Sequence, residues 1–133
     1  MSRDLVQRKL IGVVDNERSL VKIFTETLSQ IERYSVIGFT DSFLALNHVK
    51  TNKSNYALLL SELKILGMTG IELLRESKKL NPSIVCILMS EFDPNSDPGF
   101  VLSVKEKFID GFIEKPVDTV QLLADIKGKL HIS

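Results

Sequence analysis

Five short apolar runs, each ending abruptly in polar residues, recur along this chain of 133 residues and set the strongest limit on its fold. Short apolar runs bounded by polar or turn residues are typical of strands that are buried on both faces of a sheet. We therefore predict five strands. They lie at Leu10–Val14, Val36–Phe39, Ala57–Leu60, Ile84–Met89 and Gly111–Ile113.

The segments between these runs have the pattern of helices. Within Glu17–Ile31, apolar residues recur at the spacing of a helix with one buried face. Thr69 is followed three residues later by Glu72, which is the pattern of a capping box at a helix start. We predict helices at Glu17–Ile31, from Asp41 through Val49, from Thr69 to Asn81-Pro82, near Phe100–Lys107 and from Asp118 onward. The fourth helix follows a turn-rich segment, Phe92–Gly99. In the last helix, we expect Val120, Leu123, Ile126 and Leu130 to face inward.

Strands that alternate with helices indicate one parallel sheet covered by helices on both faces. Right-handed crossovers leave few topologies, and the common solution at this length is a doubly wound, flavodoxin-like α/β fold. We expect five strands in the order 2-1-3-4-5 with five helices. No internal repeat or linker interrupts the pattern, so we expect a single domain over residues 1–133, with residues 1–9 as a polar lead-in.

Charge and composition exclude several classes of function. Seventeen basic residues balance seventeen acidic ones, so bulk charge favours neither nucleic acid nor an anionic membrane. No apolar run approaches the roughly 18 residues that span a bilayer, and the N-terminus lacks a signal-peptide pattern. The single cysteine, Cys86, lies in an apolar run, and His48 and His131 have no partner at metal-site spacing. We therefore expect a cytoplasmic protein with a reduced, packed cysteine and solvated histidines.

Polar residues follow four of the predicted strands at their carboxyl ends. They are Asp15-Asn16, Glu62, Ser90 and Lys115. The carboxyl ends of parallel strands share one edge of a sheet, and open α/β sheets place their sites at this edge. If the first, third, fourth and fifth strands are neighbours, acids, a hydroxyl and a lysine meet in one pocket, which favours a functional site.

Four motifs make the chain resemble the receiver domain of two-component response regulators (CheY-like) over nearly its whole length. Val13–Glu17 is similar to the family's V-V-D-D-E, and Glu62–Gly70 is similar to its D-x-x-M-P-G-M-D-G. Ser90 stands at the family's Thr/Ser position, and Phe112–Pro116 is similar to aromatic-x-x-K-P. The order and spacing of the four motifs carry the resemblance.

The resemblance implies a site that accepts a phosphoryl group from a histidine kinase. It assigns the phosphoacceptor position to Glu62, the phosphoryl contacts to Ser90 and Lys115, and the switch to Ser90 and Phe112. A metal and a lysine would cancel the repulsion between anions during such a transfer. The resemblance also implies a cis peptide at Lys115-Pro116, no other cofactor, and Mg²⁺ held by Asp15, Asn16, Glu62 and the backbone carbonyl of Lys64.

Three departures from the family pattern bear on the chemistry. Glu62 replaces aspartate, and its extra methylene displaces the carboxylate from the geometry set for the shorter side chain. Asn16 replaces an acid, and an amide oxygen binds a hard cation more weakly than a carboxylate does. Glu91, after Ser90, could repel a phosphoryl donor. We predict an atypical receiver in which Mg²⁺ binding is weak or absent and in which Glu62 either imitates part of the phosphorylated state or simply pairs with Lys115.

The leading hypothesis is a non-enzymatic regulatory module that binds a sensor histidine kinase or a downstream effector protein. The expected docking face comprises the helix near Phe100–Lys107, the strand Gly111–Ile113 and the final helix. We expect a monomer or weak homodimer without direct contact to nucleic acid or membrane. The alternative is a conventional Mg²⁺-dependent phosphoacceptor. A remote alternative is a phosphohydrolase or flavin binder on the same fold, although Asp15–Arg18 suits a phosphate dianion poorly.

Overall fold

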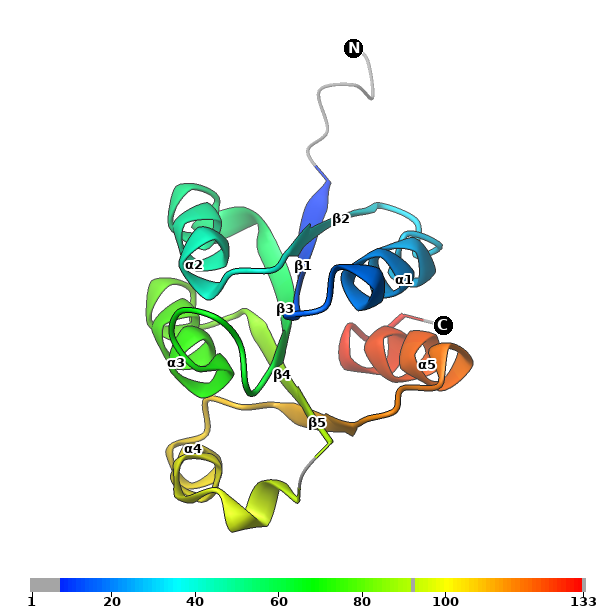
Figure 1. Ribbon diagram of the computed structural model, residues 1–133. Coiled ribbons are helices and arrows are strands. Elements are labelled where there is room, and N and C mark those ends of the chain that lie inside the picture. Colours follow the sequence, from blue (N-terminus) through cyan, green and yellow to red (C-terminus); the bar gives the residue numbers. More distant parts are fainter. Residues whose placement is uncertain (1–7, 92, 133) are drawn as a thin grey trace.

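The computed structural model contains a five-stranded parallel sheet in the order β2-β1-β3-β4-β5 (Figure 1). This confirms the predicted fold class and strand order. The structure describes residues 8–91 and 93–132, and β1 begins at Lys9, inside the predicted lead-in. The strands are β1 (Lys9–Val14), β2 (Tyr34–Phe39), β3 (Tyr56–Glu62), β4 (Val85–Ser90) and β5 (Gly111–Glu114).

Five helices connect the strands. They are α1 (Arg18–Leu28), α2 (Ser42–Thr51), α3 (Gly70–Leu80), α4 (Pro98–Glu106) and α5 (Thr119–Lys129), with short 3-10 turns η2 (Lys53–Asn55) and η3 (Pro94–Ser96). Within the described ranges, none of these helices is long and apolar enough to cross a membrane.

Two helix boundaries differ from the predictions. Helix α1 ends at Leu28, and Ile31 is buried from the turn that follows it rather than from the helix. Helix α4 begins at Pro98, before the predicted Phe100, because the Asp97 carboxylate caps its first turn and proline suits the first helical position. Phe92, the start of the predicted turn-rich segment, lies outside the described residues.

The sheet is covered on both faces, with α1 and α5 on one side and α2, α3 and α4 on the other (Figure 1). Side chains along β3 alternate between the two apolar layers: Leu58 and Leu60 pack towards α1 and α5, whereas Leu59 packs in the other cluster. All three are fully buried. Burying a leucine contributes about 1.5–3 kcal/mol, so this alternation fixes the register of β3.

The inward face of α5 differs from the prediction. Val120 is 80% exposed, whereas Leu122 and Ile126 are buried against the sheet. Successive helical residues are about 100° apart, so Val120 lies about 200° around the axis from Leu122 and faces solvent. Leu123 and Leu130 pack at the margin of the buried face, which agrees with the prediction for these two residues.

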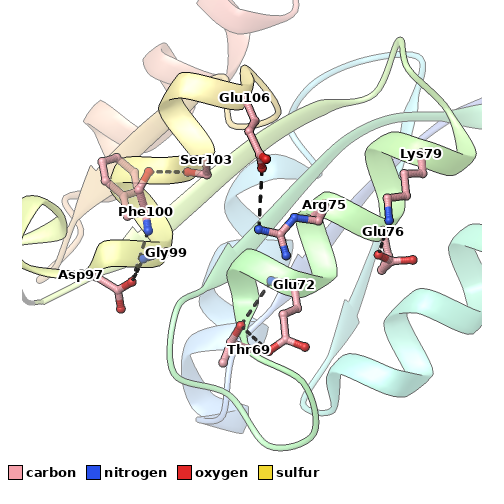
Figure 2. Close-up of polar contacts among 10 residues, drawn as sticks. All are labelled: Thr69, Glu72, Arg75, Glu76, Lys79, Asp97, Gly99, Phe100, Ser103 and Glu106. Atoms are coloured by element: carbon pink, nitrogen blue, oxygen red, sulfur yellow. Dashed lines mark hydrogen bonds and ion pairs between the residues drawn. The ribbon is translucent and has the colours of Figure 1, made fainter.

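Helices α3 and α4 lie side by side on one face of the sheet and are joined by Arg75 (Figure 2). Its guanidinium is 3.8 Å from the Glu106 carboxylate and 5.0 Å from the centre of the Phe108 ring. An exposed ion pair of this kind contributes about 0–1 kcal/mol. At the start of α3, Thr69 accepts a hydrogen bond from the Glu72 N–H, as the capping-box pattern predicts.

Candidate functional site

Backbone hydrogen bonds hold the carboxyl ends of the central strands together at one edge of the sheet. Glu62 lies opposite Met89 in the β3–β4 register. Just beyond the strand ends, the Leu63 N–H donates to the Met89 carbonyl at 2.8 Å, and the Lys115 N–H donates to the Ser90 carbonyl at 3.0 Å. The ladder therefore extends past the strands and places the predicted polar residues along one rim.

Three of these side chains form a buried charge cluster. The Lys115 ammonium donates to Asp15 Oδ2 at 2.9 Å and lies 3.2 Å from Glu62 Oε2. The side chains of Asp15 and Glu62 are only 1% and 9% exposed, and that of Lys115 is 12% exposed. The peptide bond between Lys115 and Pro116 is cis, as expected.

Lys115 binds Asp15 more closely than Glu62. The contact to Asp15 is a hydrogen bond, whereas Glu62 Oε2 forms an ion pair with Lys115 but makes no hydrogen bond to any described residue. Asp15 has a second donor, because its Oδ1 accepts from the Glu17 N–H at 2.9 Å. Asp15 is therefore the anchored acid of the cluster, and Glu62 is the less satisfied one.

The pKa values follow from this geometry. Burial raises the pKa of Glu62 above its ordinary value, and nearby Asp15 and Glu91 raise it further, while Lys115 acts in the opposite direction. Burial would lower the pKa of Lys115, but the hydrogen bond to Asp15 and the negative charges of Asp15 and Glu62 outweigh burial and raise it. Lys115 therefore stays charged at neutral pH.

Asn16 makes a different connection from the acid pair. Its side-chain Nδ2 donates to the backbone carbonyl of Lys64, and its Oδ1 accepts from the Leu66 N–H at 2.8 Å. The two predicted metal-ligand positions, Asn16 and the Lys64 carbonyl, are thus brought together, but by a direct hydrogen bond. Sequence reasoning did not foresee this bridge. The residue type could have indicated this bridge, because the amide of an asparagine carries both a hydrogen-bond donor and an acceptor.

Ser90 and Phe112 occupy separate parts of the edge. Ser90 is buried at the end of β4, and its backbone carbonyl is bonded to Lys115. The half-buried Phe112 lies on the α4 side of the sheet, where its ring meets Phe100 edge-on with the ring centres 5.8 Å apart. Phe112 thus contacts the apolar layer rather than the charges, and its predicted switch role rests on the resemblance.

A groove of about 360 Å³ lies beside the cluster, between α1 and the connection from β5 to α5. Leu20, Ile23 and Val117 line its apolar part, and Lys115 and Glu91 reach it from the site. The groove therefore gives the charge cluster an opening to solvent, flanked by apolar side chains.

The fold and this rim define a class of protein. A doubly wound 2-1-3-4-5 sheet with acids after β1 and β3 and a lysine before a cis proline after β5 is the arrangement of a receiver-type α/β domain.

The chain belongs to the response regulator receiver family. The family model described as the response regulator receiver domain matches residues 11–127. A comparison with curated proteins gives no match.

Solved structures of receiver domains match over most of the chain. A CheY-like response regulator receiver domain protein from Methanospirillum hungatei is 26% identical, with a TM-score of 0.81 over 93% of this chain and 94% of that one. The BeF3-activated receiver domain of DrrB is 25% identical, with a TM-score of 0.76 over 93% of this chain and 98% of that one. In the response regulator DrrB, a Thermotoga maritima OmpR/PhoB homolog, the match is 26% identical with a TM-score of 0.76, over 93% of this chain and 53% of that one.

The protein is therefore a response regulator receiver domain of two-component signalling. Receiver domains are generally signalling modules that interact with histidine kinases or effector domains, and they typically bind Mg²⁺ at the phosphorylation site.

The residues at this site do not fit a hard divalent cation in their present arrangement. An amide N–H of Asn16 points at the Lys64 carbonyl, and the Lys115 ammonium lies between the two carboxylates. Among the described residues, no group of three or more His, Cys, Asp or Glu side chains could hold a metal ion. Hard cations bind through free oxygen lone pairs, and here the Lys64 carbonyl and both Asp15 oxygens accept hydrogen bonds, while the Lys115 ammonium pairs with Glu62 Oε2.

Proposed function

We propose that this receiver works without phosphorylation at position 62 and signals by conformation-dependent binding of a protein partner. The Lys115–Glu62 ion pair is the observation that carries the proposal. In the family, the phosphoryl group on the acceptor aspartate contacts this lysine. The longer Glu62 side chain reaches the lysine itself, so it imitates part of the charge of a phosphorylated aspartate.

The electrostatics of the site also oppose phosphoryl transfer. A carboxylate nucleophile must approach an anionic donor, and this repulsion has to be cancelled by nearby cations. Here one ammonium already pairs with two carboxylates, and Glu91 adds a further negative charge close enough to raise the pKa of Glu62. We infer weak or absent Mg²⁺ binding and little or no phosphoacceptor activity.

The output surface in this proposal is the face of α4, β5 and α5. The exposed apolar side chains of Val101, Leu102 and Val104 on α4 support it. Ser90 and Phe112 would couple the charge cluster to this face, and a sensor histidine kinase or a downstream effector protein would bind there. The proposal treats residues 1–133 as one cytoplasmic receiver domain, a monomer or weak homodimer, with no direct contact to nucleic acid.

Intact mass after incubation with acetyl phosphate and MgCl₂ tests the proposal. We expect the wild-type chain to remain unmodified. The double variant N16D/E62D restores both family acids and is expected to gain one phosphoryl mass, which controls for the reagent. A stable phosphoryl adduct on the wild-type chain would contradict the proposal and favour the conventional phosphoacceptor.

A second test follows the conformation rather than the chemistry. Glu62→Gln keeps the size of the side chain and removes its charge, so it should break the ion pair with Lys115. We expect amide chemical shifts of Phe112 and of α4 to change, whereas the matched variant Glu32→Gln, at an exposed position in the turn after α1, leaves them near wild type. Unchanged shifts in Glu62→Gln would show that the ion pair does not control the output face.

A further inference from the structure

The connection between β3 and α3 is held from two sides by side chains of other connections. The Leu66 N–H donates to Asn16 Oδ1 at 2.8 Å. The Leu66 carbonyl accepts from the Ser42 backbone N–H at 3.2 Å and from the Ser42 hydroxyl at 3.0 Å. One peptide segment of this loop is therefore fixed by the turn after β1 and by the start of α2.

Burial holds this loop only in part, because Leu63 is buried and Ile65 and Met68 pack against the apolar layer, but the stretch around Leu66 is exposed. The Leu66 side chain is 71% exposed, and Lys64 and Gly67 are exposed as well. Gly67 has a positive φ of 97°, and a Cβ there would lie 2.5 Å from the Ser42 hydroxyl, so the backbone approaches α2 closely. Polar contacts therefore set the position of the exposed stretch around Leu66.

We propose that the Asn16 amide takes the structural place of a divalent cation and keeps the β3–α3 loop assembled without metal. Its Nδ2–H groups can donate to the Lys64 carbonyl, and its Oδ1 can accept from the Leu66 N–H, so one neutral side chain satisfies both. An aspartate of the same size would accept from Leu66 but would set a negative oxygen against the Lys64 carbonyl. That pair of acceptors requires a cation between them.

Asn16 is a positioning residue in this view, because it acts through the backbone of Lys64 and Leu66. The inference deepens the proposed function and rests on it for its role in signalling, since it gives a physical reason for independence from Mg²⁺. The geometry of the bridge itself does not depend on whether Glu62 accepts a phosphoryl group.

Three variants separate the possibilities. Asn16→Ala removes both hydrogen bonds, and Asn16→Asp keeps the shape but replaces the donor with an acceptor. Asn47→Asp adds the same charge at an exposed position on α2 and is the matched control. Each is compared with the wild-type chain by amide hydrogen exchange at Leu66 and by thermal unfolding, with and without millimolar MgCl₂.

We expect Mg²⁺ to change neither the exchange rate nor the Tm of the wild-type chain and of Asn47→Asp. Exchange at Leu66 should become about tenfold faster in Asn16→Ala, with or without metal, because a hydrogen bond that protects this amide is lost. In Asn16→Asp without metal, the exchange rate of the Leu66 amide should rise by a similar factor. Mg²⁺ should then restore the protection of this amide and raise the Tm, because a ligand that binds only the native state stabilises that state.

Two results would overturn the inference: saturable stabilisation of the wild-type chain by Mg²⁺, or wild-type protection of Leu66 in Asn16→Ala. The acetyl phosphate experiment distinguishes this failure from failure of the proposed function. A wild-type chain that gains a phosphoryl mass but whose Leu66 protection depends on Asn16 would refute the proposed function and leave the inference standing.

Discussion

Lys115 is the single positive charge shared by two carboxylates that are almost fully buried. The side chain of Asp15 is 1% exposed and that of Glu62 is 9% exposed. Neither acid can recover its lost hydration from solvent, so each depends on the ammonium and on the few N–H groups nearby. A charge left unpaired in such a place costs more than the pair itself contributes.

Lys115→Met is therefore expected to lower the free energy of unfolding by about 3–5 kcal/mol at neutral pH, the usual cost of removing one partner from a buried ion pair. Urea unfolding followed by circular dichroism measures this loss. Lys105→Met, at an exposed position on α4, is the matched control and should change stability by less than about 0.5 kcal/mol. Adding Asp15→Asn to the Lys115→Met chain should recover part of the loss. Full stability of Lys115→Met would show that the two carboxylates are not both charged in the native state.

Individual residues differ in how far their place could be predicted from the sequence. Asp15, Glu62 and Lys115 were predictable because each lies at or just after the carboxyl end of a strand, and the parallel sheet brings strand ends together. His48 was predicted to be solvated, and this is wrong: its Nδ1 lies 2.8 Å from the Tyr56 hydroxyl, on a half-buried ring. The bridge made by Asn16 was also missed. The reason is the same for both contacts: each joins residues from different elements, and no spacing along the chain indicates it.

At the scale of elements, the start of α3 is packed directly on the end of β3. Gly70 is the first residue of α3, and its N–H donates to the Leu63 carbonyl at 2.8 Å. A Cβ at this position would lie 2.1 Å from the Glu62 carbonyl oxygen and 3.1 Å from the Leu63 Cα. The strand that carries Glu62 and the following helix can approach this closely only because position 70 has no side chain.

Gly70→Ala is expected to destabilise the protein by about 1–3 kcal/mol, because backbone atoms of β3 or α3 must move to admit a methyl group. Gly128→Ala in α5 is the matched control. A Cβ there meets no atom within 4 Å, and because alanine favours the helix over glycine in this last turn, the variant should gain up to about 0.5–1 kcal/mol. Urea unfolding measures whether Gly70→Ala lowers the free energy of unfolding and Gly128→Ala raises it. Equal stability of the two variants would contradict the close packing of α3 on β3.

The elements themselves were predictable to different degrees. Strands β1, β3 and β4 were found because a strand buried on both faces must be a continuous apolar run. The inward face of α5 was partly wrong, since Val120 is exposed and Leu122 is buried. Helix α5 has apolar residues on more than one face, so periodicity alone does not say which of them contacts the sheet.

At the scale of the whole molecule, the apolar layer on the side of α2, α3 and α4 encloses two ionisable groups outside the charge cluster. Cys86 is fully buried, and burial raises the pKa of its thiol from 9.0 to about 12. Smaller effects come from Lys78, which lowers this pKa, and from Asp110, which raises it. Tyr56 is 2% exposed, its hydroxyl faces His48, and burial raises its pKa well above 10.0. Both groups are neutral in the native state at neutral pH. They therefore do not oppose folding as long as the unfolded chain also keeps its protons on these two groups.

The raised pKa values of these two groups predict that the free energy of unfolding falls steeply at alkaline pH. Above 9.0 for Cys86 and 10.0 for Tyr56, the unfolded chain releases a proton that the native chain retains. The unfolded state then binds fewer protons, so the free energy of unfolding falls as pH rises, whereas below these values the contribution is fully present. Over the first pH unit above 10.0, Cys86 should remove about 1.3 kcal/mol and Tyr56, which is only half deprotonated in the unfolded chain at pH 10.0, about 1 kcal/mol.

Urea unfolding across this pH range measures the slope and assigns it to residues. Tyr56→Phe and Cys86→Ala should each remove about one proton's share of the slope above pH 10.0, and the double variant should remove both. These variants also change packing at every pH, which shifts the whole curve, so the slope and not the stability at one pH is the informative quantity. Ile87→Val, at a buried position on β4, changes packing without removing a titratable group, so it should shift the curve and keep the wild-type slope. If Tyr56→Phe and Cys86→Ala both kept that slope, the alkaline loss would have to come from other groups, and this apolar layer would not hold the two side chains as neutral, desolvated groups.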